Sequence, residues 1–216
     1  MEILQEVWSV RLDLLQGLWL TVLISLSAIM LGTLLGTAVG IVLTYGSWLM
    51  RLPARIYADF VRGTPVLVLI LAAFYILAVV GIDLTAVQAG IFALTLFCGS
   101  HVGEIVRGAL QAIPRGQTDA AKSIGLTFGQ TFVHVLLPQA IRQILPTWIT
   151  AATEIVKAST LLSVIGVSEL LLTTQEIISR NFMNLEFYLV AGIIYFFIDF
   201  GIERIGKAVD RRMRVG

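Results

Sequence analysis

A set of polar residues between positions 150 and 160 has the types and spacing to bind a small charged ligand. Thr150, Thr153, Glu154, Lys157 and Thr160 recur at helical spacings of three and four residues, which predicts a polar stripe along one helix. Glu154 and Lys157 could each supply one counter-charge to a ligand that carries both an ammonium and a carboxylate group. They could equally pair with one another at i and i+3, which would make two charges tolerable in an apolar helix. Both interpretations remain open at this point.

Other residue types give no sign of catalysis or of metal binding. His101 and His134 lie far apart and lack companion Cys or acidic ligands, so no metal site is predicted. The sequence contains no G-x-x-x-x-G-K-[ST] phosphate-binding loop, so this chain is not predicted to hydrolyse ATP. The single Cys98 excludes an intrachain disulfide, and a net charge of +1 does not indicate a nucleic-acid partner.

The polar stripe must be positioned within a membrane, because the rest of the chain is very apolar. Hydrophobic residues make up 57% of the 216 residues, charged residues only 13%, and the mean hydropathy is +0.91. These values lie outside the range of soluble globular domains. We therefore predict a single all-α membrane domain over residues 1–216.

Five membrane spans are predicted from the uncharged and weakly charged runs. We place them at residues 14–46, 55–81, 85–110, 139–166 and 184–208. The last two contain charged residues, among them Glu154, Lys157 and Asp199. Because a charge that faces lipid is expensive, these two spans are expected to face the bundle interior or a water-filled path, with Asp199 bonded inside the bundle.

The positions of Lys and Arg predict the orientation of the chain. With five spans, the two ends lie on opposite sides of the membrane. A cytoplasmic C-terminus puts every Lys and Arg on the cytoplasmic side except Arg11, Lys157 and Arg180. The positive-inside rule therefore favours an outside N-terminus and a cytoplasmic C-terminus. The same orientation puts segment 114–138 in the cytoplasm.

One face of the first span carries small residues at a regular spacing. Ala28, Gly32, Gly36 and Gly40 recur every four residues, so another helix could approach this face closely. Glycine is also simply common in membrane helices. The strict four-residue register favours a packing seam.

Segment 114–138 has the pattern of two short helices separated by a bend. Thr118 is predicted to cap the first helix, which places Asp119 in its first turn, where a negative charge favours the helix dipole. Ala120 and Ala121 then offer a small, flat surface. Gly125 is predicted to end this helix in the left-handed conformation.

The second short helix has its own start and stop signals. Thr127 and Gln130 have the T-x-x-Q spacing of a capping box. Pro138 is expected to stop this helix or to tilt it into the next span. The segment is therefore expected to lie along the cytoplasmic face of the membrane.

The same segment resembles the EAA loop in the permease subunits of bacterial ABC importers. That pattern is Glu-Ala-Ala, three residues, Gly, nine residues and Ile-x-Leu-Pro. The spacing matches at every position, with Asp for Glu and Val for Ile, at Asp119, Ala120, Ala121, Gly125, Val135, Leu137 and Pro138. Flanking motifs resemble those of the histidine, glutamine and arginine branch of polar amino-acid permeases, namely 61–68 (VRGTPVLV), 103–109 (GEIVRGA) and 157–161 (KASTL). The last motif adds Ser159 and Thr160 to the candidate substrate path.

The resemblance implies a type I ABC importer (MetI-like) permease fold, with five transmembrane helices and cytoplasmic coupling helices. It implies a bacterial cytoplasmic (inner) membrane location and uptake of an amino acid by alternating access. The implied partners are a pair of ABC ATPase subunits, a second permease subunit that is identical or paralogous, and a periplasmic or extracytoplasmic solute-binding protein. ATP and Mg would be bound by the ATPase partner, with no cofactor in this chain. The coupling role falls on Asp119, Ala120, Ala121, Gly125, Leu137 and Pro138.

Two other classes of function remain as alternatives. An ATP-independent secondary transporter of amino acids or ions could use Glu154 and Lys157 for coupling, although no inverted repeat is visible in the sequence. A structural membrane scaffold would need neither residue. The identity of the amino acid is not encoded in any motif of the chain.

Overall fold

The computed structural model describes the backbone of residues 2–215 and the side chains of residues 5–212. Within this part of the chain the protein consists of helices and short turns, without a strand. Residues 1 and 216 of the predicted domain, and the side chain of Arg214, lie outside what is described.

The helices follow one another with short connections. In chain order they are α1 (Glu2–Ser9), α2 (Arg11–Tyr45), α3 (Trp48–Gly63), α4 (Val66–Leu71), α5 (Leu77–Val79), α6 (Ala86–Ala112), α7 (Arg115–Ser123), α8 (Phe128–Thr131), α9 (Leu137–Ala158), α10 (Leu170–Asn181) and α11 (Asn184–Val215). Two π-helical turns, η1 (Ala72–Ile76) and η2 (Phe132–Leu136), and one 3₁₀ segment, η3 (Ser159–Ile165), connect some of them.

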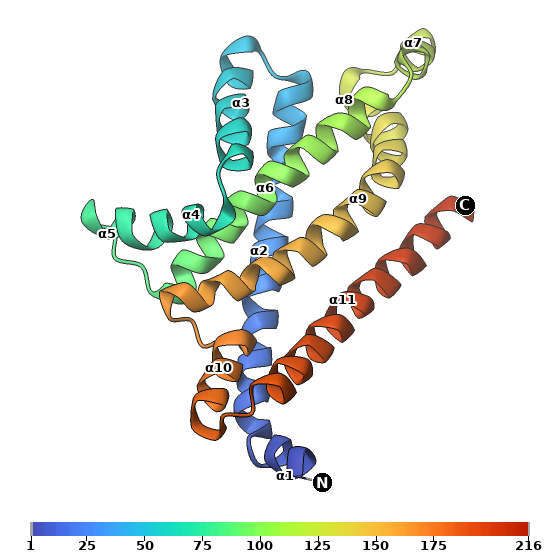
Figure 1. Cartoon of the computed structure of the whole chain (residues 1–216). Coiled ribbons are helices and arrows are strands. Elements are labelled where there is room, and N and C mark those ends of the chain that lie inside the picture. The colour runs from blue at the N-terminus through green and yellow to red at the C-terminus, as the bar shows by residue number, and fades with distance from the viewer. Residues whose placement is uncertain (1, 216) are drawn as a thin grey trace.

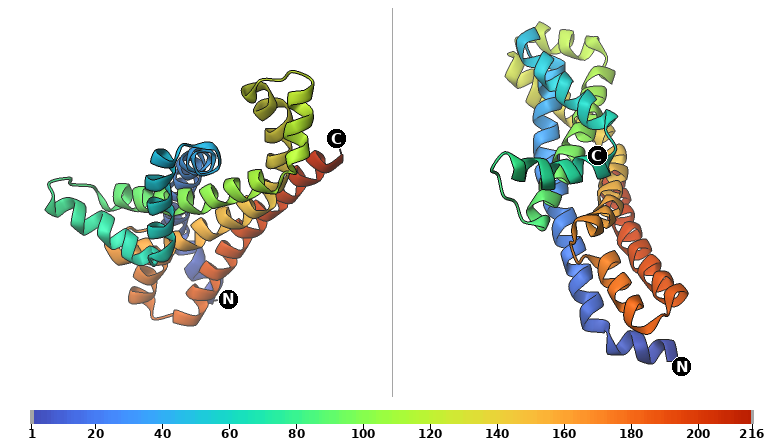
Figure 2. Two further views of the ribbon diagram at one scale, coloured as in Figure 1. Left: turned by 90° about the horizontal axis from the view of Figure 1, so that it is seen from above. Right: turned by 60° about the vertical axis from the view of Figure 1, so that its left-hand side comes forward.

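The long helix α2 runs between the two ends of the molecule (Figure 1). The N-terminus and α10 lie at one end, which we call the α10 end. The turn between α7 and α8 lies at the other, the α7 end, in Figure 1 and in the right-hand view of Figure 2. Helices α6, α9 and α11 cross the region between the two ends.

Four of the described helices are long and apolar enough to cross a membrane. By length and composition these are Arg11–Tyr45, Ala86–Ala112, Phe128–Ile165 and Asn184–Arg212. They overlap the predicted spans 14–46, 85–110, 139–166 and 184–208. Helix α11 exposes large apolar side chains such as Leu189, Phe196 and Phe197, as expected of a helix that faces lipid.

The predicted span 55–81 is not one straight helix. Helix α3 and the segment 66–79 meet at an angle of 112°. Pro65 causes the break, because proline has no N–H to donate and disfavours a helical conformation in the residue before it. Thr64 is accordingly extended, with φ −103° and ψ 133°. Segment 66–79 is about 20 Å long at 1.5 Å per residue, shorter than the hydrocarbon core of about 30 Å.

A very close helix contact lies along the small-residue face of α2. A Cβ atom added at Gly36 would lie 2.6 Å from Cβ of Val102 and 2.7 Å from the carbonyl oxygen of Gly99, both on α6. Gly32 and Gly40 approach Cys98 and Gly103 of α6 equally closely. The two backbones therefore meet with no room for a side chain on α2.

A hydrogen bond attaches α9 to the same helix. The indole Nε1 of Trp148 donates to Oγ1 of Thr33 at 2.8 Å. Buried residues of α2, α6 and α9, including Ile24, Leu94 and Ile155, form one continuous apolar core. Helix α2 is thus the element against which α6 and α9 are positioned.

We expect Gly36→Ala to lower the free energy of unfolding in detergent by about 1–3 kcal/mol, because the added methyl group must displace the α6 backbone. The matched control is Gly108→Ala on α6, where an added Cβ meets no atom within 4 Å. Thermal unfolding of the two purified variants measures the difference. Equal unfolding temperatures would contradict a tight seam.

Candidate functional site

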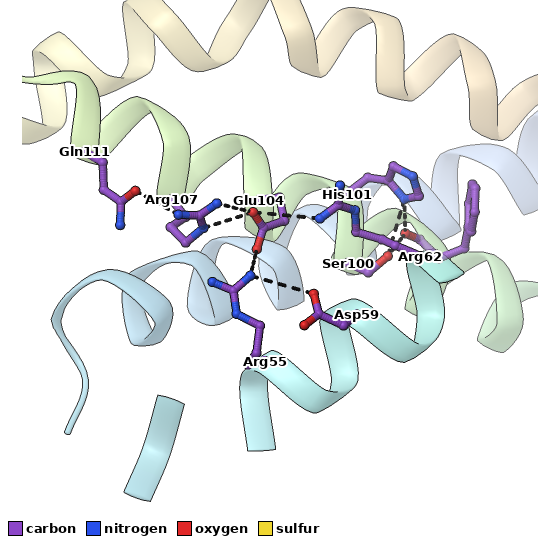
Figure 3. A network of polar contacts seen from close by, with 9 residues as sticks. Arg55, Asp59, Arg62, Ser100, His101, Glu104, Arg107 and Gln111 are labelled. Atoms are coloured by element: carbon purple, nitrogen blue, oxygen red, sulfur yellow. Dashed lines mark hydrogen bonds and ion pairs between the residues drawn. The ribbon is translucent and has the colours of Figure 1, made fainter. Parts of the chain in front are cut away.

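A cluster of charged side chains joins α3 to α6 near the bend after Gly63 (Figure 3). Glu104 accepts a hydrogen bond from Nη1 of Arg55 at 3.0 Å and from Nε of Arg107 at 2.9 Å. Nη1 of Arg62 lies 3.8 Å from the same carboxylate. Glu104 and Arg107 are three residues apart on α6, whereas the two arginines of α3 reach Glu104 only through the fold.

Arg62 is the most weakly held cation of this cluster. Its side chain is 41% exposed, and among the described residues it donates no hydrogen bond. Arg55 and Arg107 each donate to Glu104 at hydrogen-bonding distance, and Arg55 also lies 3.7 Å from Asp59. Arg62 therefore keeps donors available for another anionic group.

A groove of about 360 Å³ lies between α6 and α9, next to this cluster. Its lining residues are Arg62, His101, Glu104, Ile105, Thr147, Thr150, Ala151 and Glu154. Glu154 is exposed and forms no hydrogen bond or ion pair with any described residue. The groove thus presents an available guanidinium and an available carboxylate to one space.

The polar stripe of α9 divides into two parts. Thr150 and Glu154 face the groove, whereas Thr153 is buried and its hydroxyl donates to the carbonyl of Thr150 at 2.8 Å. Nζ of Lys157 lies 3.4 Å from Oδ2 of Asp199 on α11. Glu154 and Lys157 therefore do not pair with each other in the structure. The partner of Lys157 is Asp199 of α11.

The KASTL motif (157–161) extends from α9 into η3, and its residues lie outside the groove lining. Ser159 is buried and donates to the carbonyl of Val156 at 2.7 Å. Thr160 donates to the carbonyl of Lys157 at 2.6 Å. Both hydroxyls satisfy backbone carbonyls at the end of α9, and neither residue is part of the groove lining.

The turn between α7 and α8 follows the local sequence signals. Gly125 has φ +83°, and its N–H donates to the carbonyl of Lys122 while the N–H of Leu126 donates to that of Ala121. This pair of bonds is a Schellman motif, which needs a residue in the left-handed conformation. The capping box of Thr127 and Gln130 is also present, with both bonds made.

The start of α7 differs from the expectation. The helix begins at Arg115, directly after Pro114, so Thr118 is not its N-cap and Asp119 lies beyond its first turn. Pro114 already provides the helix boundary, because a proline has its φ preset and needs no N–H partner there. Asp119 and Ala120 are exposed, whereas Ala121 is buried against the turn.

Pro138 does not end the helix that starts at Phe128. The chain stays helical from Phe128 to Ile165, because the π turn η2 accommodates the missing N–H. The N–H of Leu137 reaches back five residues to the carbonyl of Phe132, and Nε2 of Gln139 donates to the carbonyl of Val135 at 2.8 Å. The surface helix α8 and the groove helix α9 are therefore parts of one helical segment that is not interrupted by a loop.

Glu169 is a site residue that the sequence did not single out. It is fully buried and caps α10, with Oε1 accepting from the N–H of Leu172 at 2.9 Å and Oε2 from that of Leu171 at 3.0 Å. The hydroxyl of Tyr195 on α11 donates to Oε2 at 2.6 Å. Burial raises the pKa of the Glu169 carboxyl above its ordinary value, although these hydrogen bonds oppose the shift. Only its N-cap position could have been read from the sequence.

Long apolar helices, a polar groove between them and an exposed helical turn at one end define the transmembrane subunit of a transport system. The chain belongs to the family of binding-protein-dependent transport system inner membrane components, whose model matches residues 28–215. It is accordingly a multi-pass inner-membrane protein, and the predicted all-α permease fold is confirmed.

Relatives and solved structures agree with this assignment. The chain is 33% identical to the probable amino-acid ABC transporter permease protein YckA of Bacillus subtilis, covering 85% of this chain and 81% of the relative. It is 30% identical to the glutamine transport system permease protein GlnP of Escherichia coli, over 97% and 96% of the two chains. These relatives confirm the resemblance to permeases of polar amino-acid ABC importers.

Two solved structures share the fold. A crystal structure of an amino acid ABC transporter with histidines superposes with a TM-score of 0.89 at 30% identity, covering 98% of this chain and 99% of that one. The methionine ABC transporter MetNI, in an inward-facing conformation, gives a TM-score of 0.79 at 20% identity, with 95% and 98% covered. At that identity the second likeness concerns the fold alone.

We expect Glu104→Ala to lower the free energy of unfolding by about 3 kcal/mol, because Arg55, Arg62 and Arg107 would lose their shared counter-charge. The control is Asp59→Ala, which removes a carboxylate that is 59% exposed and 3.7 Å from Arg55. That change is expected to cost less than about 1 kcal/mol. Thermal unfolding in detergent compares the two, and similar losses would show that Glu104 is not the centre of the cluster.

Proposed function

We propose that this chain is the permease subunit of an ATP-driven amino-acid importer, and that the groove beside α9 forms one wall of its translocation path. The observation that carries the proposal is the unbroken helical segment from Phe128 to Ile165. One part of this segment, α8, lies on the exposed surface at the α7 end, and another part lines the polar groove. Movement of the surface helix can therefore reach the path without crossing a loop.

The groove has the chemistry to hold a zwitterionic amino acid. Arg62 can bind the carboxylate, and Glu154 can bind the ammonium group, since each lacks a close hydrogen-bond partner among the described residues. Thr147 and Thr150 add hydroxyl groups to the same lining. Lys157 acts indirectly in this proposal, through its ion pair with Asp199 of α11.

A second permease subunit, identical or paralogous, completes the path. Thr147, Thr150 and Glu154 are exposed on a helix that is long and apolar enough to cross the bilayer. A row of polar side chains is costly in lipid. We infer that this face of α9 meets the corresponding face of the partner permease across a water-filled path.

A pair of ATPase subunits is proposed to dock at the α7 end. Ile124 and Phe128 are exposed there and lie next to Asp119, Ala120 and Gly125. The bend at Gly125 would seat α7 and α8 in the ATPase surface, and the ATPase would bind ATP and Mg. Closure of the ATPase pair would pull α8, and with it α9, so that the groove opens alternately to the two sides.

The proposed orientation places the α7 end in the cytoplasm and the α10 end outside. The Lys and Arg residues favour this arrangement through the positive-inside rule. A solute-binding protein would then deliver the amino acid at the α10 end. The alternative of an ATP-independent secondary transporter is not favoured by the family.

Reconstitution in proteoliposomes tests the proposal as a whole. The chain is co-expressed with its ATPase subunits, and uptake of radiolabelled glutamine, arginine and histidine is measured with the solute-binding protein, with and without ATP. ATP-dependent uptake supports the importer. Uptake by the chain alone, driven by an ion gradient, would support the secondary transporter instead.

We expect Gly125→Val to abolish ATP-driven uptake while membrane insertion stays normal. A non-glycine residue in the left-handed region costs about 1–2 kcal/mol, and a β-branched one fits worst. Gly125→Asn is the matched control, because asparagine tolerates this conformation and should keep most of the uptake. Normal coupled ATPase activity in the valine variant would exclude a coupling role for the bend.

We expect Glu154→Gln to raise the amino-acid concentration needed for half-maximal uptake by about tenfold, because a bond to a charged group is lost. Binding to the ATPase subunits should be unchanged. Glu176→Gln on α10, an exposed carboxylate outside the groove, serves as the control. Equal uptake by the two variants would remove Glu154 from the substrate path.

A further inference from the structure

Three helices meet at the buried carboxylate of Glu169. The residue begins α10 and accepts the hydroxyl hydrogen of Tyr195 from α11. One residue later, the N–H of Leu170 donates to Oγ1 of Thr21 on α2 at 3.0 Å. The N-terminus of α10 is thereby bound to α2 on one side and to α11 on the other. Gly17 of α2 lies so close that an added Cβ would be 2.7 Å from Oγ1 of Thr173 on α10.

The bonds at Glu169 make this junction rigid. A buried carboxylate is stable only when its oxygens are hydrogen-bonded, and here two backbone N–H groups and one phenol hydroxyl donate to it. The positive end of the α10 dipole adds to its stabilisation. Displacing α2 or α11 relative to α10 would therefore leave a buried polar group without a partner.

The segment between α9 and this junction has a different character. Segment η3 is a 3₁₀ helix of 7 residues, longer than the three or four residues at which such runs usually end. Ser159, Thr160 and Ser163 donate their hydroxyl hydrogens to carbonyls three residues back. Gly166, with φ +81°, ends the segment. Because 3₁₀ hydrogen bonds have poorer geometry than those of an α-helix, this end segment deforms more easily than α9 itself.

A change of η3 between 3₁₀ and α geometry would alter the distance between the end of α9 and the junction. The rise per residue is about 2.0 Å in the first and about 1.5 Å in the second, so the whole segment would shorten by about 3–4 Å. A Ser or Thr hydroxyl in a helix can donate to the carbonyl three or four residues back, so the three side-chain bonds can be kept in either geometry. The end of α9 can thus move while the junction at Glu169 stays in place.

We propose that Glu169 is a positioning residue for transport: it caps α10 and holds it to α11 through Tyr195, beside the bond from Leu170 to Thr21 of α2, so that the junction stays in place while η3 lets the end of α9 move. This inference rests on the proposed function, because it concerns how movement from an ATPase reaches the groove. If the bonds to Tyr195 and Thr21 are lost, α10 moves together with α9 during the ATPase cycle, and the groove does not reopen fully.

The deciding variant is Tyr195→Phe, in the complete complex reconstituted in proteoliposomes. Glu169→Ala is expected to fail to assemble, since it removes the cap of a buried helix end. Tyr195→Phe keeps the carboxylate and both cap bonds and removes only the bond to α11. The matched control is Tyr188→Phe, on the same helix, where the tyrosine is exposed and makes no hydrogen bond with the described residues.

The measured quantity is the number of amino acids imported per ATP hydrolysed. We expect this ratio to fall severalfold in Tyr195→Phe, where α10 is no longer bonded to α11 through Glu169, and to stay at the wild-type value in Tyr188→Phe. Thr21→Val, which removes the link to α2, is expected to lower the ratio as well. A purely structural role would reduce the yield of complex and leave the ratio per complex unchanged.

Two failures can be told apart in this experiment. An unchanged ratio in Tyr195→Phe and Thr21→Val, in complexes that transport normally, overturns the anchoring role of Glu169 and leaves the importer in place. An absence of ATP-driven uptake in the wild-type complex overturns the proposed function itself.

Discussion

The backbone contact between α2 and α6 is the constraint on which the other parts of the molecule depend. Lipid is as apolar as the helix surfaces, so helices in a membrane associate through close packing instead of hydrophobic burial. Gly32, Gly36 and Gly40 allow this packing because they place no side chain between the two backbones. Helix α6, which packs on this face, contributes His101 and Glu104 to the groove. Helix α9 is bound to α2 as well, because Trp148 donates a hydrogen bond to Thr33. Both walls of the groove are therefore positioned by one helix.

Two prolines show how context decides the effect of a missing N–H. At Pro65 the chain turns through 112° and the predicted span breaks into two helices. At Pro138 the π turn η2 and the side chain of Gln139 accommodate the lost donor, and the helix continues. The break lets α3 bring Arg55 and Arg62 to Glu104. The continuation joins the exposed surface at α8 to the groove, which a stopped helix could not do.

Two carboxylates hold helices together at two places in the molecule, one at the groove and the other at the start of α10. Glu104 holds arginines from α3 and α6, and Glu169 holds α10 to α11 with α2 alongside. The first lies beside the groove with part of its surface exposed, whereas the second is completely buried. Helix α9 lines the groove beside the first and continues into the 3₁₀ segment η3, which leads toward the second. A carboxylate therefore lines the groove at Glu104, whereas the one at Glu169 holds the start of α10 to α11.

The sequence by itself predicted the features that depend on neighbouring residues. The apolar runs predicted four of the helices that can span a membrane, and the left-handed Gly125 and the capping box of Thr127 with Gln130 followed from their immediate neighbours. The motif spacing indicated the family. Only the tertiary structure decided that Lys157 pairs with Asp199 instead of Glu154, that Arg55 reaches Glu104, and that Glu169 binds Tyr195. The reason is physical: a cap or a turn depends on atoms a few residues away, whereas these partners meet only after distant helices have packed.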